Sequence, residues 1–123
     1  MSKATIKDYE EITEVINRYV QGVSLGKSEV MKPSFYKDAT MYGYVQGVGP
    51  SEGPIQSLYD IVDQGGPAPN LKGRIDILDL EGTAASARVV LEDAQVVIYT
   101  DFHHLLKIDG EWKIISKIFH HHS

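Results

Sequence analysis

The chain has 123 residues and a mass of 13.7 kDa, the size of one ordinary domain with a core of its own. Hydrophobic residues make up 42% and charged residues 24%, which excludes a disordered chain, and the lack of cysteine excludes disulfides, thiolate metal sites and thiol nucleophiles. The net charge of -5 comes with no basic stripe, so we expect no nucleic-acid or membrane partner and a soluble, cytoplasmic protein.

The N-terminal third predicts one long helix and one short helix. Thr5 and Asp8 have the spacing of a capping box at a helix start, and Gly26 suits the C-terminal end. Ser28 can cap a second, short helix, which Pro33 would break because proline has no N–H to donate. Apolar residues recur at spacings of three and four along the first helix, as on one buried face: Ile6, Tyr9, Ile12, Ile16, Tyr19, Val20 and Val23.

The middle of the chain predicts a short strand, a loop and a third helix. The strand covers residues 40–45, and the four glycines between 43 and 53 predict a loop. Pro54 fits the first turn of a helix whose buried side comes from residues 55–62, and residues 64–70 (QGGPAPN) form another loop. The run Gly47-Val48-Gly49 is too short for a dinucleotide-binding fingerprint, and no strand–glycine–helix context surrounds it.

The second half of the chain changes to the period of two that is typical of strands. Four strands are predicted, over residues 74–80, 84–91, 96–108 and 111–120. Asp109-Gly110, flanked by alternating apolar residues, is the strongest hairpin signal in the chain. Helices followed by an antiparallel meander indicate an α+β fold.

The Asp109-Gly110 turn predicts the register of the last hairpin. A two-residue turn pairs Ile108 with Glu111, and therefore Phe102 with Lys117, unless a β-bulge swaps the two faces beyond its position. One predicted face carries Phe102, His104, Leu106, Lys117 and Phe119, and the other Asp101, His103, Leu105, Trp112, Ile114 and Ile118. Since one face must pack on the helices, the second would expose an apolar patch, and we predict a homodimer through the sheet with Leu105, Trp112, Ile114 and Ile118 at its interface.

Several motifs resemble the nuclear transport factor 2-like superfamily, which includes ketosteroid isomerases and SnoaL-like cyclases: residues 17–20 (NRYV), 35–41 (FYKDATM), 101–102 (DF) and 105–114 (LLKIDGEWKI). The chain is most similar to the family called "putative lumazine-binding" at residues 53–56 (GPIQ), 82–88 (GTAASAR) and 112–120 (WKIISKIFH). The resemblance implies one domain over residues 1–123, a cystatin-like cone. Three N-terminal helices would pack in a strongly curved antiparallel sheet around a largely apolar pocket, in a homodimer.

The resemblance also allows the isomerase site to be compared residue by residue. Aligning the motif at 38–41 places Gly43 where these isomerases have their carboxylate base. Their oxyanion tyrosine matches Tyr19, their protonated aspartic acid falls at His104, and a supporting tyrosine matches Tyr59. Because Gly43 has no carboxylate, the resemblance does not extend to steroid isomerisation.

His104 is the predicted catalytic residue, as an acid or base on the face that the alignment aims at the pocket, although it could also be a structural histidine. Tyr19 would orient a ligand oxygen or fill the core. Lys117 would anchor an anionic ligand or extend to the pocket rim. The remaining predicted pocket residues, which could equally be core, are Phe102, Leu106, Phe119 and Tyr59.

The five histidines, all between residues 103 and 122, fall on both faces of the hairpin, so no metal site is predicted. Three functions remain open. The first is a cofactor-free acid–base lyase, isomerase or cyclase for a small apolar cyclic or carbonyl compound. The second is a non-catalytic binder of an aromatic or pterin-like heterocycle. The third is a dimeric scaffold or accessory subunit with a vestigial pocket.

Overall fold

The structure is a computed structural model that describes residues 4–51, 53–94 and 97–122. Its helical elements are α1 (Ile6–Leu25), α2 (Ser28–Met31), a 3₁₀ turn (Lys32–Ser34) and α3 (Gln56–Gly65). Its strands are β1 (Phe35–Val45), β2 (Gly49–Ser51), β3 (Lys72–Glu81), β4 (Ala84–Ala94), β5 (Val97–Ile108) and β6 (Glu111–His122). None of the helices within the described residues has the length and apolar character needed to cross a membrane.

Helix α1 begins and ends where the sequence predicts. The Thr5 side chain accepts a hydrogen bond from the Asp8 amide, the Asp8 carboxylate accepts one from the Thr5 amide, and Gly26 ends the helix at a left-handed φ of 69°. Asp8 also accepts hydrogen bonds from Trp112 Nε1 and Lys107 Nζ, both at 3.2 Å. These bonds fix the start of α1 against the β5–β6 hairpin.

The six strands form one mixed sheet in the order β2-β1-β6-β5-β4-β3. All neighbouring pairs are antiparallel except β1 and β6, which run parallel. The α+β class is confirmed, but two details of the prediction are wrong. The sheet is not purely antiparallel, and only α1 and α2 precede it, because α3 follows β2 in the chain. The predicted loop at residues 43–53 instead contains a short hairpin in which Gly43 pairs with Ser51.

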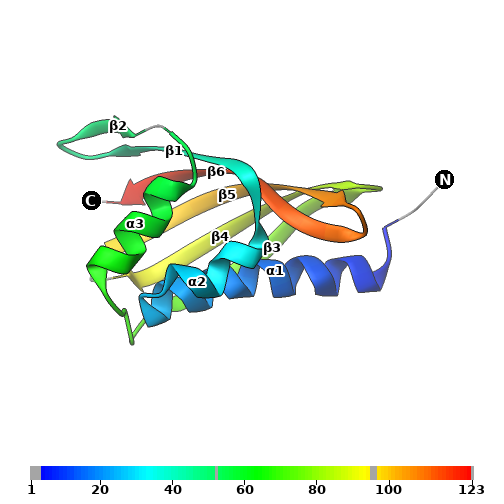
Figure 1. The fold of residues 1–123 in the computed structure, drawn as a ribbon, viewed down its shortest axis with the longest axis horizontal. Helices are drawn as coiled ribbons and strands as arrows, with labels where there is room; N and C mark the ends of the chain where they lie inside the picture. The colour runs from blue at the N-terminus through cyan, green and yellow to red at the C-terminus, as the bar shows by residue number, and fades with distance from the viewer. Residues whose placement is uncertain (1–3, 52, 95–96, 123) are drawn as a thin grey trace.

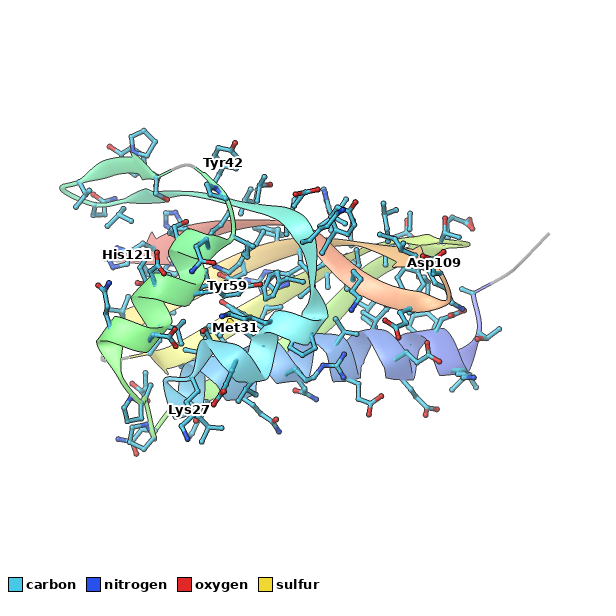
Figure 2. All side chains as sticks on the ribbon, viewed as in Figure 1. Lys27, Met31, Tyr42, Tyr59, Asp109 and His121 are labelled. Carbon is cyan, nitrogen blue, oxygen red and sulfur yellow. The ribbon has the colours of Figure 1, made fainter. Side chains whose placement is uncertain are left out.

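The helices lie on one side of the sheet, with α1 running along its length and α3 near the end where β6 finishes (Figure 1). Figure 2 shows Met31 and Tyr59 inside the molecule and Tyr42 on its outside. The core lies between these two layers, where Ile12, Ile16 and Met31 are completely buried. Predicted strand limits agree with β3 to β6 within a few residues. Val96, the predicted first residue of the strand that corresponds to β5, lies outside the described residues.

A β-bulge at Ile115 changes the register of the β5–β6 hairpin. Near the turn the prediction is confirmed, since Ile108 pairs with Glu111 and Leu105 with Ile114. The next residue of β5, His104, pairs with Ser116 instead of Ile115, so every later pair is displaced by one. The predicted pairing of Phe102 with Lys117 is therefore wrong, because Lys117 pairs with His103.

The bulge changes which residues of β6 face the helices, whereas β5 keeps its regular alternation. On β5 the inward side chains are Asp101, His103 and Leu105, which are at most 1% exposed, while Phe102 is 39% exposed on the outer face. On β6 the inward side chains are Trp112 and Ile114 before the bulge, and Lys117 and Phe119 after it. Each predicted face thus mixes inner and outer residues.

The residues predicted for the dimer interface must be corrected. Leu105, Trp112 and Ile114 belong to the core of the single chain, and Ile118, at 50% exposed, is the one predicted interface residue on the outer face. Ile98 and Phe102 are also exposed on β5. The homodimer stays a prediction, and this outer apolar surface would have to carry it.

Candidate functional site

Asp101 is the centre of a buried polar cluster between α1 and the sheet. Its Oδ2 accepts a hydrogen bond of 2.7 Å from the Tyr19 hydroxyl, and His103 Nε2 lies 3.5 Å from the same oxygen. Neither Asp101 nor His103 has any exposed surface. Tyr19 comes from the apolar stripe of α1, so the amphipathic pattern of that helix and the strand alternation of β5 together bring these three side chains into contact.

Lys117 completes the cluster from β6. Its Nζ lies 3.9 Å from Asp101 Oδ1 and donates to Met41 Sδ at 3.4 Å. The same ammonium group lies 4.7 Å from the centre of the Phe119 ring and 5.5 Å from that of Tyr19. Lys117 therefore sits among a carboxylate, a thioether and two aromatic faces, with only 4% of the residue exposed.

A cavity of about 170 Å³ opens beside Lys117 and Tyr19. An apolar cavity of roughly 150 Å³ can hold a benzene molecule, so this space fits a ligand of about one ring. Its polar side chains are few, as is usual for small-molecule sites. The other residues that line it come from α1, α3, the loop after α3 and the sheet, and include Val23, Leu58, Val62, Leu91, Tyr99 and Phe119.

The pKa values of the cluster are shifted chiefly by burial. Burial lowers the pKa of Lys117, against the attraction of Asp101, and so favours the neutral amine. Burial also lowers the pKa of His103, which keeps its imidazole neutral at pH 7. Burial alone would raise the pKa of Asp101, but Lys117, His103 and Tyr19 together hold it below its ordinary value, so Asp101 is a carboxylate. Burial and Asp101 both raise the pKa of Tyr19.

Two atoms of the cluster have no hydrogen-bond partner among the described residues, Asp101 Oδ1 and His103 Nδ1. Both are buried, and a buried polar atom without a partner costs about 1–3 kcal/mol. Unpaired buried polar atoms of this kind are often found where a protein transfers a proton or binds a ligand.

Gly43 lies against the ring of Phe119. A Cβ built at Gly43 would fall 2.4 Å from two of the ring carbons, closer than any side chain can approach. The Phe119 ring lines the cavity at this point. A side chain at position 43 would therefore require the Phe119 ring to move.

The structure separates the predicted site residues into two groups. Tyr19, Lys117 and Phe119 line the cavity, while Tyr59 is buried against Phe35 at a ring-centroid distance of 6.0 Å. The predicted orientation of His104 toward the pocket is wrong, because β5 alternation turns it to the outer face, where it is exposed. Phe102 and Leu106 lie on that outer face too, for the same reason.

Sequence reasoning placed Asp101 and His103 on the wrong side of the sheet. The adjacent apolar residues Ile114 and Ile115 interrupt the alternation of β6, and this doublet is the signal that could have located the bulge. No group of three or more histidine, aspartate or glutamate side chains in the part of the chain that the structure describes is arranged to hold a metal ion.

The chain matches the family described as "Putative lumazine-binding" over residues 7–120. It belongs to this family. A solved NTF2-like protein of unknown function from Shewanella baltica OS155 is 38% identical, with a TM-score of 0.93 and 99% of each chain covered, which places the family in the nuclear transport factor 2-like superfamily. A solved Nostoc punctiforme domain of unknown function with a cystatin-like fold, 15% identical, has a TM-score of 0.75 over 98% of this chain and 80% of its own, and shows the fold alone.

Among proteins with a named activity, this chain is similar to the aldolase FrzH of Cladobotryum sp. The two are 34% identical over 117 residues, which cover 94% of this chain and 93% of the aldolase. The similarity thus extends over nearly the whole length of both chains.

Proposed function

We propose that this protein is a cofactor-free enzyme that makes or breaks a carbon–carbon bond next to the carbonyl group of a small, mostly apolar compound. The observation that carries the proposal is a buried carboxylate, Asp101, linked to Tyr19 and Lys117, which both line an otherwise apolar cavity. The similarity to an aldolase over nearly the whole chain supports the same class of reaction.

The geometry supports an acid–base role for Tyr19 and Asp101. The Tyr19 hydroxyl donates its proton to Asp101 Oδ2 at 2.7 Å, so its oxygen lone pairs are free to accept the proton of a substrate hydroxyl. In the cleavage direction, the hydroxyl proton of a β-hydroxy ketone would pass to Tyr19 as the tyrosine proton passes to Asp101. Asp101 is then a positioning residue and proton acceptor behind Tyr19, and such proton transfers contribute about 10²–10⁴-fold to a rate.

Diacetone alcohol is a suitable test compound, because it is a small β-hydroxy ketone whose cleavage gives two molecules of acetone. Proton NMR follows that cleavage directly. We expect the wild type to accelerate it, and Asp101→Asn and Tyr19→Phe to lower the rate by about 10²-fold or more. The matched controls are Asp38→Asn and Tyr42→Phe, since both side chains are exposed. Cleavage no faster than in buffer, or equally fast in Asp101→Asn, contradicts the proposal.

A second candidate, a binder of flat heterocycles, is favoured by the aromatic wall of the cavity. Tyr99 and Phe119 both line it and pack edge to face at 5.8 Å between ring centroids. Such a wall can stack on a planar ring. A thermal-shift measurement with lumazine and with pterin tests this function. If the protein is a binder, these ligands should raise the melting temperature of the wild type and of Asp101→Asn equally. Neither protein should then cleave diacetone alcohol.

A further inference from the structure

We propose that Lys117 is the nucleophile of this site and that its Nζ forms an imine with the carbonyl carbon of the substrate. This inference rests on the proposed function in one respect, namely that the ligand of the cavity is a ketone or aldehyde. It adds a covalent residue to a site for which Tyr19 and Asp101 supply only proton transfer.

The position of Nζ supports a nucleophilic role. Lys117 lines the cavity, and its only hydrogen-bond acceptor among the described residues is the weakly accepting sulfur of Met41, at 3.4 Å. Asp101 Oδ1, at 3.9 Å, is near enough to attract the ammonium ion but too far to accept a hydrogen bond from it. A lysine that served only as a counter-ion would be expected to close this gap, because Oδ1 has no other partner.

The surroundings of Lys117 make its Nζ easier to deprotonate than that of an ordinary lysine. The groups that face it are the carboxylate of Asp101, the neutral ring of His103 in the paired position on β5, and the aromatic rings of Tyr19 and Phe119. Burial removes water from Nζ, and this effect is larger than the attraction of the Asp101 carboxylate for the ammonium ion. The pKa of Lys117 is therefore lowered. Desolvation in an apolar pocket is an established way to make a lysine amine nucleophilic.

Imine formation balances without any co-reactant. The lone pair of Nζ attacks the carbonyl carbon, and the electrons of the C=O double bond move to oxygen to give a carbinolamine. The carbinolamine oxygen then leaves as water when the nitrogen lone pair forms the C=N bond. Counted from the ammonium form, one ammonium ion and one ketone give one iminium ion and one water molecule, with no net gain or loss of protons. Asp101 Oδ1 is the adjacent acceptor for the proton that Nζ must release before it attacks. That proton returns to the carbinolamine oxygen as it leaves as water, so Asp101 is a carboxylate again before the carbon–carbon bond is cleaved.

The iminium ion then accepts the electrons of the broken carbon–carbon bond. In cleavage, the β-hydroxyl proton passes to Tyr19, whose own proton passes to Asp101, and the hydroxyl carbon becomes a carbonyl that leaves. The bonding pair between the two carbons moves into an enamine on Nζ. The enamine carbon takes back a proton, and water hydrolyses the resulting iminium ion to release the ketone and restore Lys117.

Reductive trapping tests the inference on the intact protein. Cyclohexanone, a single ring that suits the cavity, is incubated with the wild type and sodium cyanoborohydride at pH 7, which reduces an iminium ion to a stable secondary amine. We expect an increase in intact mass equal to that of the ketone less one oxygen atom. Protease digestion and mass spectrometry should place the adduct on Lys117, because this lysine lines the cavity that would hold the ketone.

Two variants of lysines on the same strand provide the comparison. Lys117→Arg keeps a positive charge beside Asp101 but cannot form an imine, whereas Lys113→Arg changes a partly exposed lysine that donates to the Pro33 carbonyl. We expect the adduct to be lost in Lys117→Arg and kept in Lys113→Arg. Lys117→Met serves as a second variant without the larger guanidinium group, and circular dichroism shows which variants are folded. The wild-type peptide map decides the site of the adduct even if neither variant folds.

The possible outcomes separate the inference from the proposed function. An adduct confined to Lys117 supports the inference. An adduct spread over surface lysines, or absent from Lys117, overturns it. If diacetone alcohol is cleaved as fast by folded Lys117→Met as by the wild type, the imine is excluded while the proposed function stands. If Lys117 is trapped but no cleavage occurs, the nucleophilic lysine stands and the proposed function fails.

Discussion

Replacing Tyr19 by phenylalanine tests the buried cluster with the smallest possible change. The substitution removes one hydroxyl whose oxygen lies 2.7 Å from Asp101 Oδ2, and leaves the ring in place among buried neighbours. A hydrogen bond to a charged group contributes about 1.5–3 kcal/mol, and Asp101 is ionised. We therefore expect the free energy of unfolding to fall by about 2 kcal/mol at pH 7.

Urea unfolding followed by the fluorescence of Trp112, the only tryptophan, measures this change. Tyr42→Phe is the control, because Tyr42 is 45% exposed and its substitution should alter stability by no more than about 0.5 kcal/mol. The pKa of folded Asp101 is below the ordinary 3.8, so its ionised form stabilises the protein above that pH, and the stabilisation is lost as the pH falls through the folded value. The effect of Tyr19→Phe should shrink in the same range. Equal stability of Tyr19→Phe and wild type at pH 7 would refute the buried contact with the Asp101 carboxylate.

Three other changes probe the register, the charge and the packing of the site. His103→Gln should lower the free energy of unfolding by roughly 1–3 kcal/mol and His104→Gln by less than about 0.5, and equal effects in chemical denaturation would contradict the register around the bulge. The pKa of Lys117 in the folded protein is below the ordinary 10.5, so between these two pKa values the unfolded chain binds more protons than the folded one. The free energy of unfolding of the wild type should therefore rise with pH in that range, until the tyrosines ionise. The same rise in Lys117→Met would refute the burial of the Lys117 amine. Gly43→Ala should cost about 1–3 kcal/mol in thermal or urea unfolding, since its Cβ would displace the Phe119 ring, and a fully stable variant would show that the ring does not pack there.

Local sequence signals were sufficient for most of the secondary structure. The capping box at Thr5 and Asp8 and the glycine at 26 mark the ends of α1, because both act within a few residues of the chain. The Asp109-Gly110 turn gives the register of the first four pairs of its hairpin for the same reason. In contrast, the parallel pairing of β1 with β6 joins distant parts of the chain and has no local signal.

The candidate site was only partly predictable because one residue changes its geometry. Strict alternation from the turn assigns Lys117 and His104 to the same face, but the extra residue at Ile115 puts Lys117 beside Asp101 and His103 instead. Tyr19 is a candidate through the resemblance to isomerases, and Lys117 through its place on one predicted face of the hairpin. Their common partner, Asp101, was placed on the opposite face, because the comparison with isomerases directed His104 toward the pocket and strand alternation then turned Asp101 away from it.

The most direct test of the account is the rate of diacetone alcohol cleavage in two β5 variants, Asp101→Asn and His104→Gln. The side chains point to opposite faces of the same strand, and only Asp101 contacts Tyr19 and Lys117. We predict that Asp101→Asn lowers the rate by about 10²-fold or more, and that His104→Gln retains the wild-type rate. Loss of cleavage in His104→Gln with full activity in Asp101→Asn would contradict the assignment of the reaction to the inner face of the sheet.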